Sequence, residues 1–150
     1  MIVLDTNVLS ELMNPRPSPV VVGWLASQPE HLLVTTAITA AEIHAGVAIL
    51  PHGKRRRDLH ARALSVLAPY EDRTLVFDTQ SALHYAEVVA IRRAIGRVSH
   101  PQDAMIAAIC RHHGATLATR NVDDFERIGL DLINPWDAPS GQDAESSGVR

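Results

Sequence analysis

The sequence predicts an α/β protein, a three-layer α/β/α sandwich built on a central, mostly parallel sheet of four to five strands. Short, continuously apolar runs alternate with longer segments whose apolar residues recur at helical spacing. Strands that are apolar on both sides are typical of a parallel sheet covered by helices on both faces. Right-handed crossovers should connect these strands, and a ligand site is expected at their carboxyl ends.

Four clear apolar runs and a fifth, weaker one are the expected strands: Ile2–Leu4, Leu32–Thr35, Thr74–Phe77, Ala115–Ala118 and Leu130–Ile133. The main helical patterns between them are Val20–Ser27, Ala40–Leu50, Arg57–Leu67, Gln80–Ile95 and Gln102–His112. A shorter one, Val8–Met13, and the segment Val20–Leu25 present apolar residues for the core or for a partner. Gly114 stands where the end of a helix favours glycine.

Bulk properties indicate one domain of ordinary size. Of 150 residues, 46% are hydrophobic, which suffices for a core, and we expect the domain to span residues 1–137. Residues 138–150 are rich in Gly, Ser and acidic residues, so a disordered tail is expected there. No stretch approaches the roughly 18 apolar residues of a membrane span, and the start lacks signal-peptide features. With Cys110 as the single cysteine, a reducing, cytoplasmic location is expected.

The formal net charge of -3 does not indicate a strongly basic nucleic-acid-binding protein. Attraction to a polyanion would have to come from local basic patches or from a bound metal ion. Two patches are candidates, Lys54–Arg57 and the group Arg92, Arg93 and Arg97. Each can be interpreted as a set of phosphate contacts or as a solvated helix face. No His or Cys spacing typical of a zinc site is present.

Polar and acidic residues stand near the expected carboxyl ends of the strands. They are Asp5, Glu42, Asp103, Thr119, Asn121 and Asp124. Helix capping is a simpler explanation for each: Asp5 or Thr6 can cap a helix, Thr39–Glu42 and Ser99–Gln102 fit capping boxes, and Asn121 can cap a short helix that contains Asp124. Asp78 also ends an expected strand, and we interpret it as a helix cap alone.

Helix capping can explain each of these residues alone, but it explains less well why so many acids stand near the same expected strand ends. If Asp5, Glu42 and Asp103 share one rim, two unit charges about 4 Å apart repel by roughly 4 kcal/mol at an effective dielectric constant near 20. A fold tolerates this through carboxyl protonation or a bound cation. Oxygen ligands suit a hard ion, Mg²⁺ or Mn²⁺. Spacing alone does not establish that these residues converge.

Four segments carry a resemblance to a known family. Met1–Glu11 contains Asp5-Thr6-Asn7, and it is followed by Ile38–Ile43, by Asp103–Ala108 and by Ala118–Phe125. In order and spacing these segments resemble the PIN-domain ribonucleases, most closely the FitB-like branch of the VapC toxins of type II toxin–antitoxin pairs. The resemblance runs from about Met1 to Trp136.

The resemblance implies a Mg²⁺- or Mn²⁺-dependent endoribonuclease that cuts tRNA, rRNA or mRNA when it is free of its antitoxin protein. The family's acids fall on Asp5, Glu42 and Asp103, which would hold the metal. Its fourth acidic position falls on Asn121 here, so Asp124 is the alternative fourth residue. Thr119 falls on the position of a hydroxyl that orients a carboxylate or a water. A homodimer is also implied.

Three rival functions remain open from the sequence. A phospho-receiver module would need a lysine at a late strand end, and the only lysine is Lys54. A phosphatase with an aspartate nucleophile would want a second Asp where Asn7 stands. A PIN-type nuclease for RNA processing or DNA flaps would share the fold and the acids.

Overall fold

The computed structural model describes residues 1–139. It confirms the expected fold class: a five-stranded sheet in the order β3-β2-β1-β4-β5, in which every neighbouring pair is parallel. The strands are β1 (Ile2–Leu4), β2 (Leu33–Thr36), β3 (Thr74–Leu75), β4 (Thr116–Ala118) and β5 (Leu132–Ile133). All five expected strands are present; β3 and β5 are two residues shorter than expected, β4 is one residue shorter, and β2 begins and ends one residue later. Because β1 lies between β2 and β4, the carboxyl ends of these three strands share one edge.

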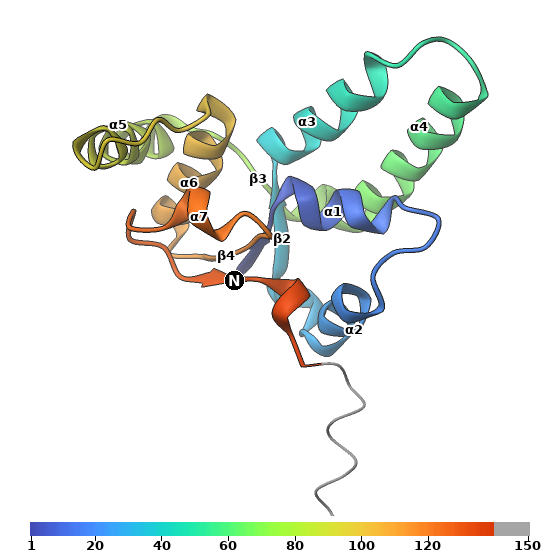
Figure 1. The fold of residues 1–150 in the computed structure, drawn as a ribbon, viewed down its shortest axis with the longest axis horizontal. Helices are drawn as coiled ribbons and strands as arrows, with labels where there is room; N and C mark the ends of the chain where they lie inside the picture. Colours follow the sequence, from blue (N-terminus) through green and yellow to red (C-terminus); the bar gives the residue numbers. More distant parts are fainter. Residues whose placement is uncertain (140–150) are drawn as a thin grey trace, which may run out of the picture.

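Helices cover both faces of this sheet, as Figure 1 shows. One layer contains α1 (Thr6–Leu12), α2 (Pro19–Ser27), α3 (Ala37–Ala48) and α4 (Lys54–Leu67). The other contains α5 (Thr79–Ala94), α6 (Pro101–His113) and α7 (Val122–Phe125). Three short 3₁₀ segments, which the sequence patterns did not indicate, are η1 (Glu30–Leu32), η2 (Ala68–Arg73) and η3 (Pro135–Asp137).

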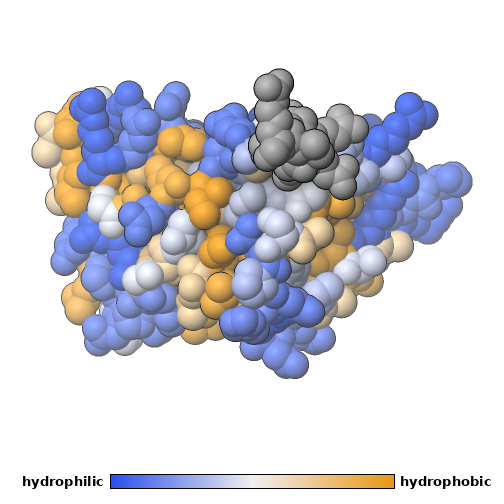
Figure 2. Space-filling model, turned by 90° about the horizontal axis from the view of Figure 1, so that it is seen from below, coloured by the Kyte–Doolittle hydropathy of each residue, from blue (hydrophilic) through white to orange (hydrophobic). Residues whose placement is uncertain are grey.

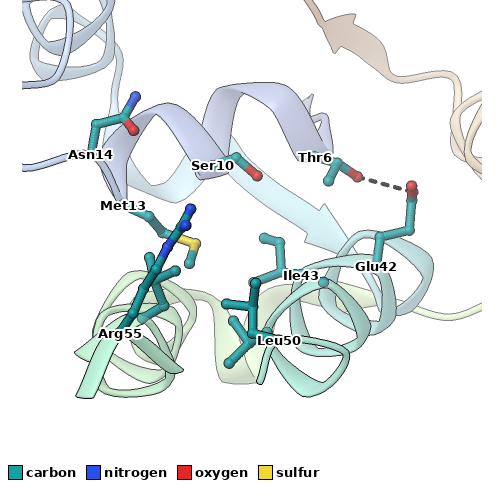
Figure 3. Close-up of a pocket in the computed structure, with 11 residues that line it drawn as sticks. Thr6, Ser10, Met13, Asn14, Glu42, Ile43, Leu50 and Arg55 are labelled. Carbon is teal, nitrogen blue, oxygen red and sulfur yellow. Dashed lines mark hydrogen bonds between the residues drawn. The ribbon is translucent and has the colours of Figure 1, made fainter. Parts of the chain in front are cut away.

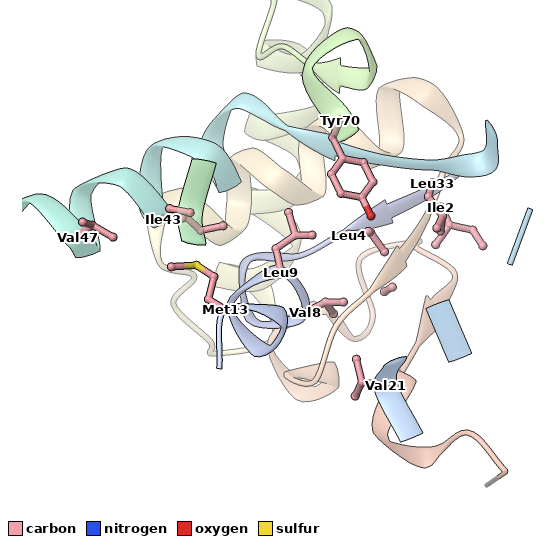
Figure 4. Packing of buried hydrophobic residues seen from close by; sticks show 12 residues of the cluster. Ile2, Leu4, Val8, Leu9, Met13, Val21, Leu33, Ile43, Val47 and Tyr70 are labelled. Carbon is pink, nitrogen blue, oxygen red and sulfur yellow. The ribbon is translucent and has the colours of Figure 1, made fainter. Parts of the chain in front are cut away.

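Alternation along the central strand divides the core into two clusters. Ile2 and Leu4 point to the cluster shared with α1 to α4, whereas Val3 points to the cluster shared with α5 to α7. In the first cluster, Val8 and Leu9 of α1 are fully buried against the sheet (Figure 4). Val8 and Leu9 therefore serve the core, as do Met13 and Val21, whereas Val22 of α2 is exposed.

Two expected capping boxes are wrong. Helix α3 begins three residues earlier than Thr39 suggests, since Thr36 is its N-cap and accepts a hydrogen bond from the Thr39 amide at 3.0 Å. Helix α6 has His100 at its N-cap without a side-chain hydrogen bond. The hydroxyl of Ser99 instead accepts a hydrogen bond from Nε of Arg92 at 3.1 Å. The first helix thus begins directly after β2, and the second begins at Pro101, a residue type that suits the first helical position.

Two other predictions about helix ends are confirmed. The Asp78 carboxylate accepts a hydrogen bond from the Ser81 amide at 2.8 Å and caps α5. Gly114 ends α6 with a left-handed φ of 58°, a conformation that is strained for other residues.

Within residues 1–139, no helix combines the length and the apolar character that a membrane crossing requires. The face in Figure 2 mixes hydrophilic and hydrophobic residues, and hydrophilic ones dominate at the end that carries the α3–α4 hairpin. The expected tail, residues 138–150, lies outside the described residues from position 140 onward.

Candidate active site at the carboxyl ends of the central strands

Asp5 occupies the centre of the candidate site, directly after β1. The residue is 3% exposed, and its carboxylate accepts hydrogen bonds from three groups: the Thr6 backbone amide at 2.7 Å, the Thr119 hydroxyl at 2.7 Å and the side-chain Nδ2 of Asn7 at 3.1 Å. Burial raises the pKa of this carboxyl, and the three hydrogen bonds oppose the rise. Asp5 also caps α1 through the bond from the Thr6 amide, so the prediction that it caps a helix is confirmed. Capping does not explain the hydrogen bonds from Thr119 and Asn7.

Thr119 links the ends of β1 and β4. Its buried hydroxyl donates to Asp5 and accepts hydrogen bonds from the Asn7 side chain at 3.2 Å and from the Asn121 amide at 3.0 Å. The hydroxyl therefore uses its one donor and both acceptor positions. The Asn7 side-chain oxygen in turn accepts from the Arg120 amide at 3.1 Å. Asp5 is thus held in one orientation from both strands.

Glu42 reaches the same edge from the second turn of α3, one turn later than expected. Its carboxylate accepts a hydrogen bond from the Thr6 hydroxyl at 3.0 Å. Partial burial raises the pKa of Glu42, the Thr6 hydrogen bond lowers it, and the nearby charge of Asp5 raises it further. The start of α1 therefore positions two carboxylates. The backbone amide of Thr6 holds Asp5, and the hydroxyl of Thr6 holds Glu42.

Asp103 lies in the first turn of α6, and its carboxyl is half-buried. Its pKa is raised to about 6, first by burial and then by the negative charges of Asp5, Asp124 and Glu42, while His100 lowers it. Helices α6 and α3 and strand β1 therefore bring their acids close enough to repel one another. The repulsion that the sequence could only anticipate is present in the folded molecule.

Asn121 and Asp124 are the two candidates for the fourth acidic position that the family resemblance implies, and they have different environments. Asn121 is the residue before α7, and its side chain makes no capping hydrogen bond. Asp124 lies within α7, and its charge raises the pKa of both Asp5 and Asp103. The electrostatic coupling thus belongs to Asp124, and Asn121 contributes its backbone amide to Thr119.

As the side chains stand, residues 1–139 contain no group of three His, Cys, Asp or Glu placed to hold a metal ion together. The acids interact through space and not by sharing a contact. Mg²⁺ commonly keeps several water ligands and binds through one or two carboxylates, so this spacing is compatible with a hydrated hard ion. The donor set consists of oxygen atoms only, which also fits such an ion and does not fit zinc.

A model of the PIN domain family matches residues 2–130. This chain belongs to the PIN-domain family. It is 42% identical to the plasmid stability protein StbB of Pseudomonas syringae pv. tomato, covering 92% of this chain and 100% of that protein. It is also 42% identical to the VapC ribonuclease Y4jK of Sinorhizobium fredii, with 91% and 99% covered, and 39% identical to the toxin FitB of Neisseria gonorrhoeae, with 91% and 99% covered.

Solved structures agree with this assignment. FitAB bound to an IR36 DNA fragment superimposes with a TM-score of 0.84 at 38% identity, covering 93% of this chain and 98% of the other. FitAcB from Neisseria gonorrhoeae gives a TM-score of 0.83 at 39% identity, with 91% and 99% covered. The fold and the family predicted from the sequence are thereby confirmed, with the FitB and VapC proteins among the relatives.

In this PIN domain a groove leads away from the acids. It lies between α1, α3 and α4, has a volume of about 330 Å³, and contains Thr6 and Glu42 at one end and Arg55 at the other (Figure 3). Apolar side chains, including Met13 and Ile43, line its middle. A polar end next to the acids and a basic end on α4 make this groove suitable for an extended chain that carries negative charge.

The two basic patches have different environments. Arg55 faces the groove, whereas Lys54 forms an exposed ion pair with Asp58 at 2.9 Å. Arg92 is 4% exposed, so for this residue both earlier interpretations, phosphate contact and solvated face, are wrong. Its guanidinium and that of Arg97 donate to the carbonyl of Asp123, which ties the end of α5 to α7.

Sequence reasoning assigned no site role to Thr6 or Asn7, although both lie in the segment that carries the family resemblance. In the structure the Thr6 hydroxyl donates to Glu42, and the side-chain Nδ2 of Asn7 donates to Asp5. Their position directly after the first strand was the available signal. Cys110 is fully buried, as expected for a packing residue, and burial raises the pKa of its thiol.

Proposed function

We propose that this chain is the ribonuclease toxin of a toxin–antitoxin pair, and that it hydrolyses RNA phosphodiester bonds with the help of Mg²⁺ or Mn²⁺. The observation that carries the proposal is the coupling of four acids, Asp5, Glu42, Asp103 and Asp124, at one edge of a PIN-domain sheet. The relatives named VapC ribonuclease and toxin FitB support the activity and its biological setting.

Asp5 and Asp103 are the proposed ligands of the ion, with Glu42 contacting it directly or through water. A hard divalent ion bound there supplies charge neutralisation and makes water more acidic, both of which phosphodiester hydrolysis needs. Thr119 and Asn7 hold the Asp5 carboxylate so that its orientation does not change when the ion binds. This role for Thr119 rests on its 2.7 Å hydrogen bond to Asp5.

Partners follow from the relatives. FitB occurs with its partner in FitAB bound to DNA, and VapBC-5 from Mycobacterium tuberculosis belongs to a family of toxin–antitoxin systems. We infer a cognate antitoxin for this chain, a homodimer, and action in the cytoplasm. The homodimer is tested by light scattering, where a monomer at micromolar concentration would contradict it.

The decisive experiment maps RNA ends after incubation of total RNA with the purified protein in Mg²⁺, Mn²⁺ or EDTA. We expect new ends with either ion, none with EDTA, and none with Asp5→Asn or Asp5→Ala. The matched control is Asp58→Asn, since Asp58 is exposed on α4 outside the acidic cluster. RNA cutting by both Asp5 variants at the wild-type rate would refute the assignment, and cleavage of DNA flaps alone would favour the alternative PIN nuclease.

The phospho-receiver alternative has no support in the geometry. Lys54, the only lysine, begins α4 and pairs with Asp58. It therefore does not stand at the end of a strand, where a receiver domain needs it.

A further inference from the structure

Arg120 is attached to the acidic site through its backbone. It follows Thr119 at the end of β4, and its amide donates to the side-chain oxygen of Asn7 at 3.1 Å. Asn7 in turn donates to Asp5 at 3.1 Å. The backbone of Arg120 is thus connected to the central carboxylate by two hydrogen bonds, while its side chain is exposed.

The guanidinium of Arg120 lies over the ring of Trp136, with its carbon 5.2 Å from the ring centre. Trp136 is itself held firmly, because its amide donates to the Asn134 side chain at 3.1 Å and its ring packs against the core cluster beside α2. Stacking therefore restricts an otherwise flexible side chain at the rim of the site.

The charge of Arg120 is not used by an ion pair within the part of the chain that the structure describes. Arg73 offers a contrast: its guanidinium carbon lies 5.5 Å from the ring centre of Tyr70, but it also pairs with Glu30 at 3.1 Å. Stacking occupies only the face of a guanidinium, and the N–H groups at its edge remain able to bind a phosphate through two parallel hydrogen bonds.

A cation at this rim has a physical purpose. The acids repel an incoming polyanion, and within residues 1–139 no ion pair joins Asp5, Glu42, Asp103 or Asp124 to a basic side chain. Single-stranded nucleic acid is held largely by contacts between phosphates and basic side chains. A fixed arginine held on Trp136, at the position that follows Thr119, would offset this repulsion at one position along the strand.

We propose that Arg120, stacked on Trp136, is a positioning residue that binds an RNA phosphate adjacent to the bond being cut. This inference rests on the proposed ribonuclease function and extends it to a subsite. The phosphate lies along the guanidinium edge, and Trp136 fixes the plane of that edge. Arg120 itself does not contact the reacting atoms.

The test is single-turnover cleavage of a short single-stranded RNA in Mg²⁺, with protein in excess. We compare the wild type with Arg120→Ala, Arg120→Lys and Trp136→Leu, and with Arg73→Ala as the matched stacked control. Arg120→Ala should raise the half-saturating protein concentration by about tenfold or more, as expected for one charge-assisted hydrogen-bonded contact. The maximal rate should stay within about threefold, because the reacting groups are intact.

Salt dependence separates a phosphate contact from a structural effect. Arg120→Ala should lower the slope of log affinity against log salt by about 0.7, the value for one phosphate of a single strand. Arg120→Lys should keep the slope and recover only part of the affinity, since lysine lacks the planar fork. Trp136→Leu should weaken binding less than Arg120→Ala and leave the salt slope unchanged.

The inference is overturned if Arg120→Ala cuts RNA with the same half-saturation and salt slope as Arg73→Ala. It is equally overturned if Arg120→Ala lowers only the maximal rate together with the melting temperature. If Arg120→Ala affects antitoxin binding but not RNA cleavage, the surface serves the protein partner instead. A wild type that cuts no RNA with either ion refutes the proposed function, and with it this subsite.

Discussion

Replacing Asp103 by Asn removes one negative charge from the acidic cluster while keeping the shape of the side chain. Burial and three other acids raise the pKa of Asp103 from 3.8 to about 6. In the absence of metal, we therefore expect Asp103→Asn to be more stable than the wild type at pH 7.5. The same substitution should abolish cleavage, since it removes a proposed metal ligand.

The size of the gain follows from the pKa. A rise from 3.8 to about 6 corresponds to about 3 kcal/mol, which is an upper value for a half-exposed group. Solvent screening reduces it to about 1.5 kcal/mol. Losing a favourable acid from the first turn of α6 costs about 0.5 kcal/mol. A net gain of about 1 kcal/mol should raise the melting temperature by roughly 3 °C for a chain of this size.

The pH dependence gives the sign independently. Because the folded-state pKa is the higher one, the folded protein holds the Asp103 proton over a range in which the unfolded chain has lost it. The stability that this group contributes is thus present at low pH and is lost as the pH rises through about 6. The advantage of Asp103→Asn should accordingly shrink between pH 6 and pH 4.

The assay is urea or thermal unfolding in EDTA at pH 7.5 and at pH 4, with Asp58→Asn as the control. The hydrogen bond from Lys54 lowers the pKa of Asp58, so its replacement should give no stabilisation at either pH. Adding Mg²⁺ should then stabilise the wild type and not Asp103→Asn. An Asp103→Asn protein that is no more stable at pH 7.5, or that is equally stabilised at pH 4, would refute the reasoning.

Three further substitutions test the supporting geometry. Thr119→Val should lower the unfolding free energy by about 1–3 kcal/mol in urea, because buried Asp5 loses its 2.7 Å hydrogen bond, whereas Thr119→Ser should be close to wild type. Arg55→Glu should weaken RNA binding and flatten its salt slope, since Arg55 lines the groove that begins at Glu42, and an unchanged slope by fluorescence anisotropy would count against that path. Arg92→Met should lower the free energy of unfolding by about 2 kcal/mol in denaturant, because the Arg92 side chain is buried and hydrogen-bonded. RNA affinity should stay unchanged, since this side chain does not face substrate.

Local pattern was sufficient to predict the layers of the fold. The apolar strand Ile2–Leu4 and its alternation define two cores, and parallel pairing brings the strand ends to one edge. That is why Asp5 and Thr119, although distant in sequence, could be expected at the same edge of the sheet. Their direct contact follows because β1 and β4 are neighbours, and the sequence analysis predicted no strand order.

The details that sequence reasoning missed depend on contacts between distant segments. Whether Thr36 or Thr39 caps α3 is decided by where β2 ends, and both residues fit the local preference. The hydrogen bond from Thr6 to Glu42 needs the exact placement of α1 against α3. Arg92 has the residue type of a surface cation, and only the packing of α5 on α6 and α7 buries it.

Asp124→Asn separates the two candidates for the fourth acidic position. Asp124 raises the pKa of Asp103, so its neutralisation should lower that pKa and shift the acidic limb of the cleavage pH profile downward. Asn121→Ala should leave the limb in place, because Asn121 contributes its backbone amide to the site and carries no charge. The measurement is the single-turnover rate between pH 5 and pH 8 at a fixed Mg²⁺ concentration below saturation, where a proton on Asp103 competes with the ion. A shift with Asn121→Ala and none with Asp124→Asn would assign the position to Asn121, and the electrostatic coupling would then have no catalytic consequence.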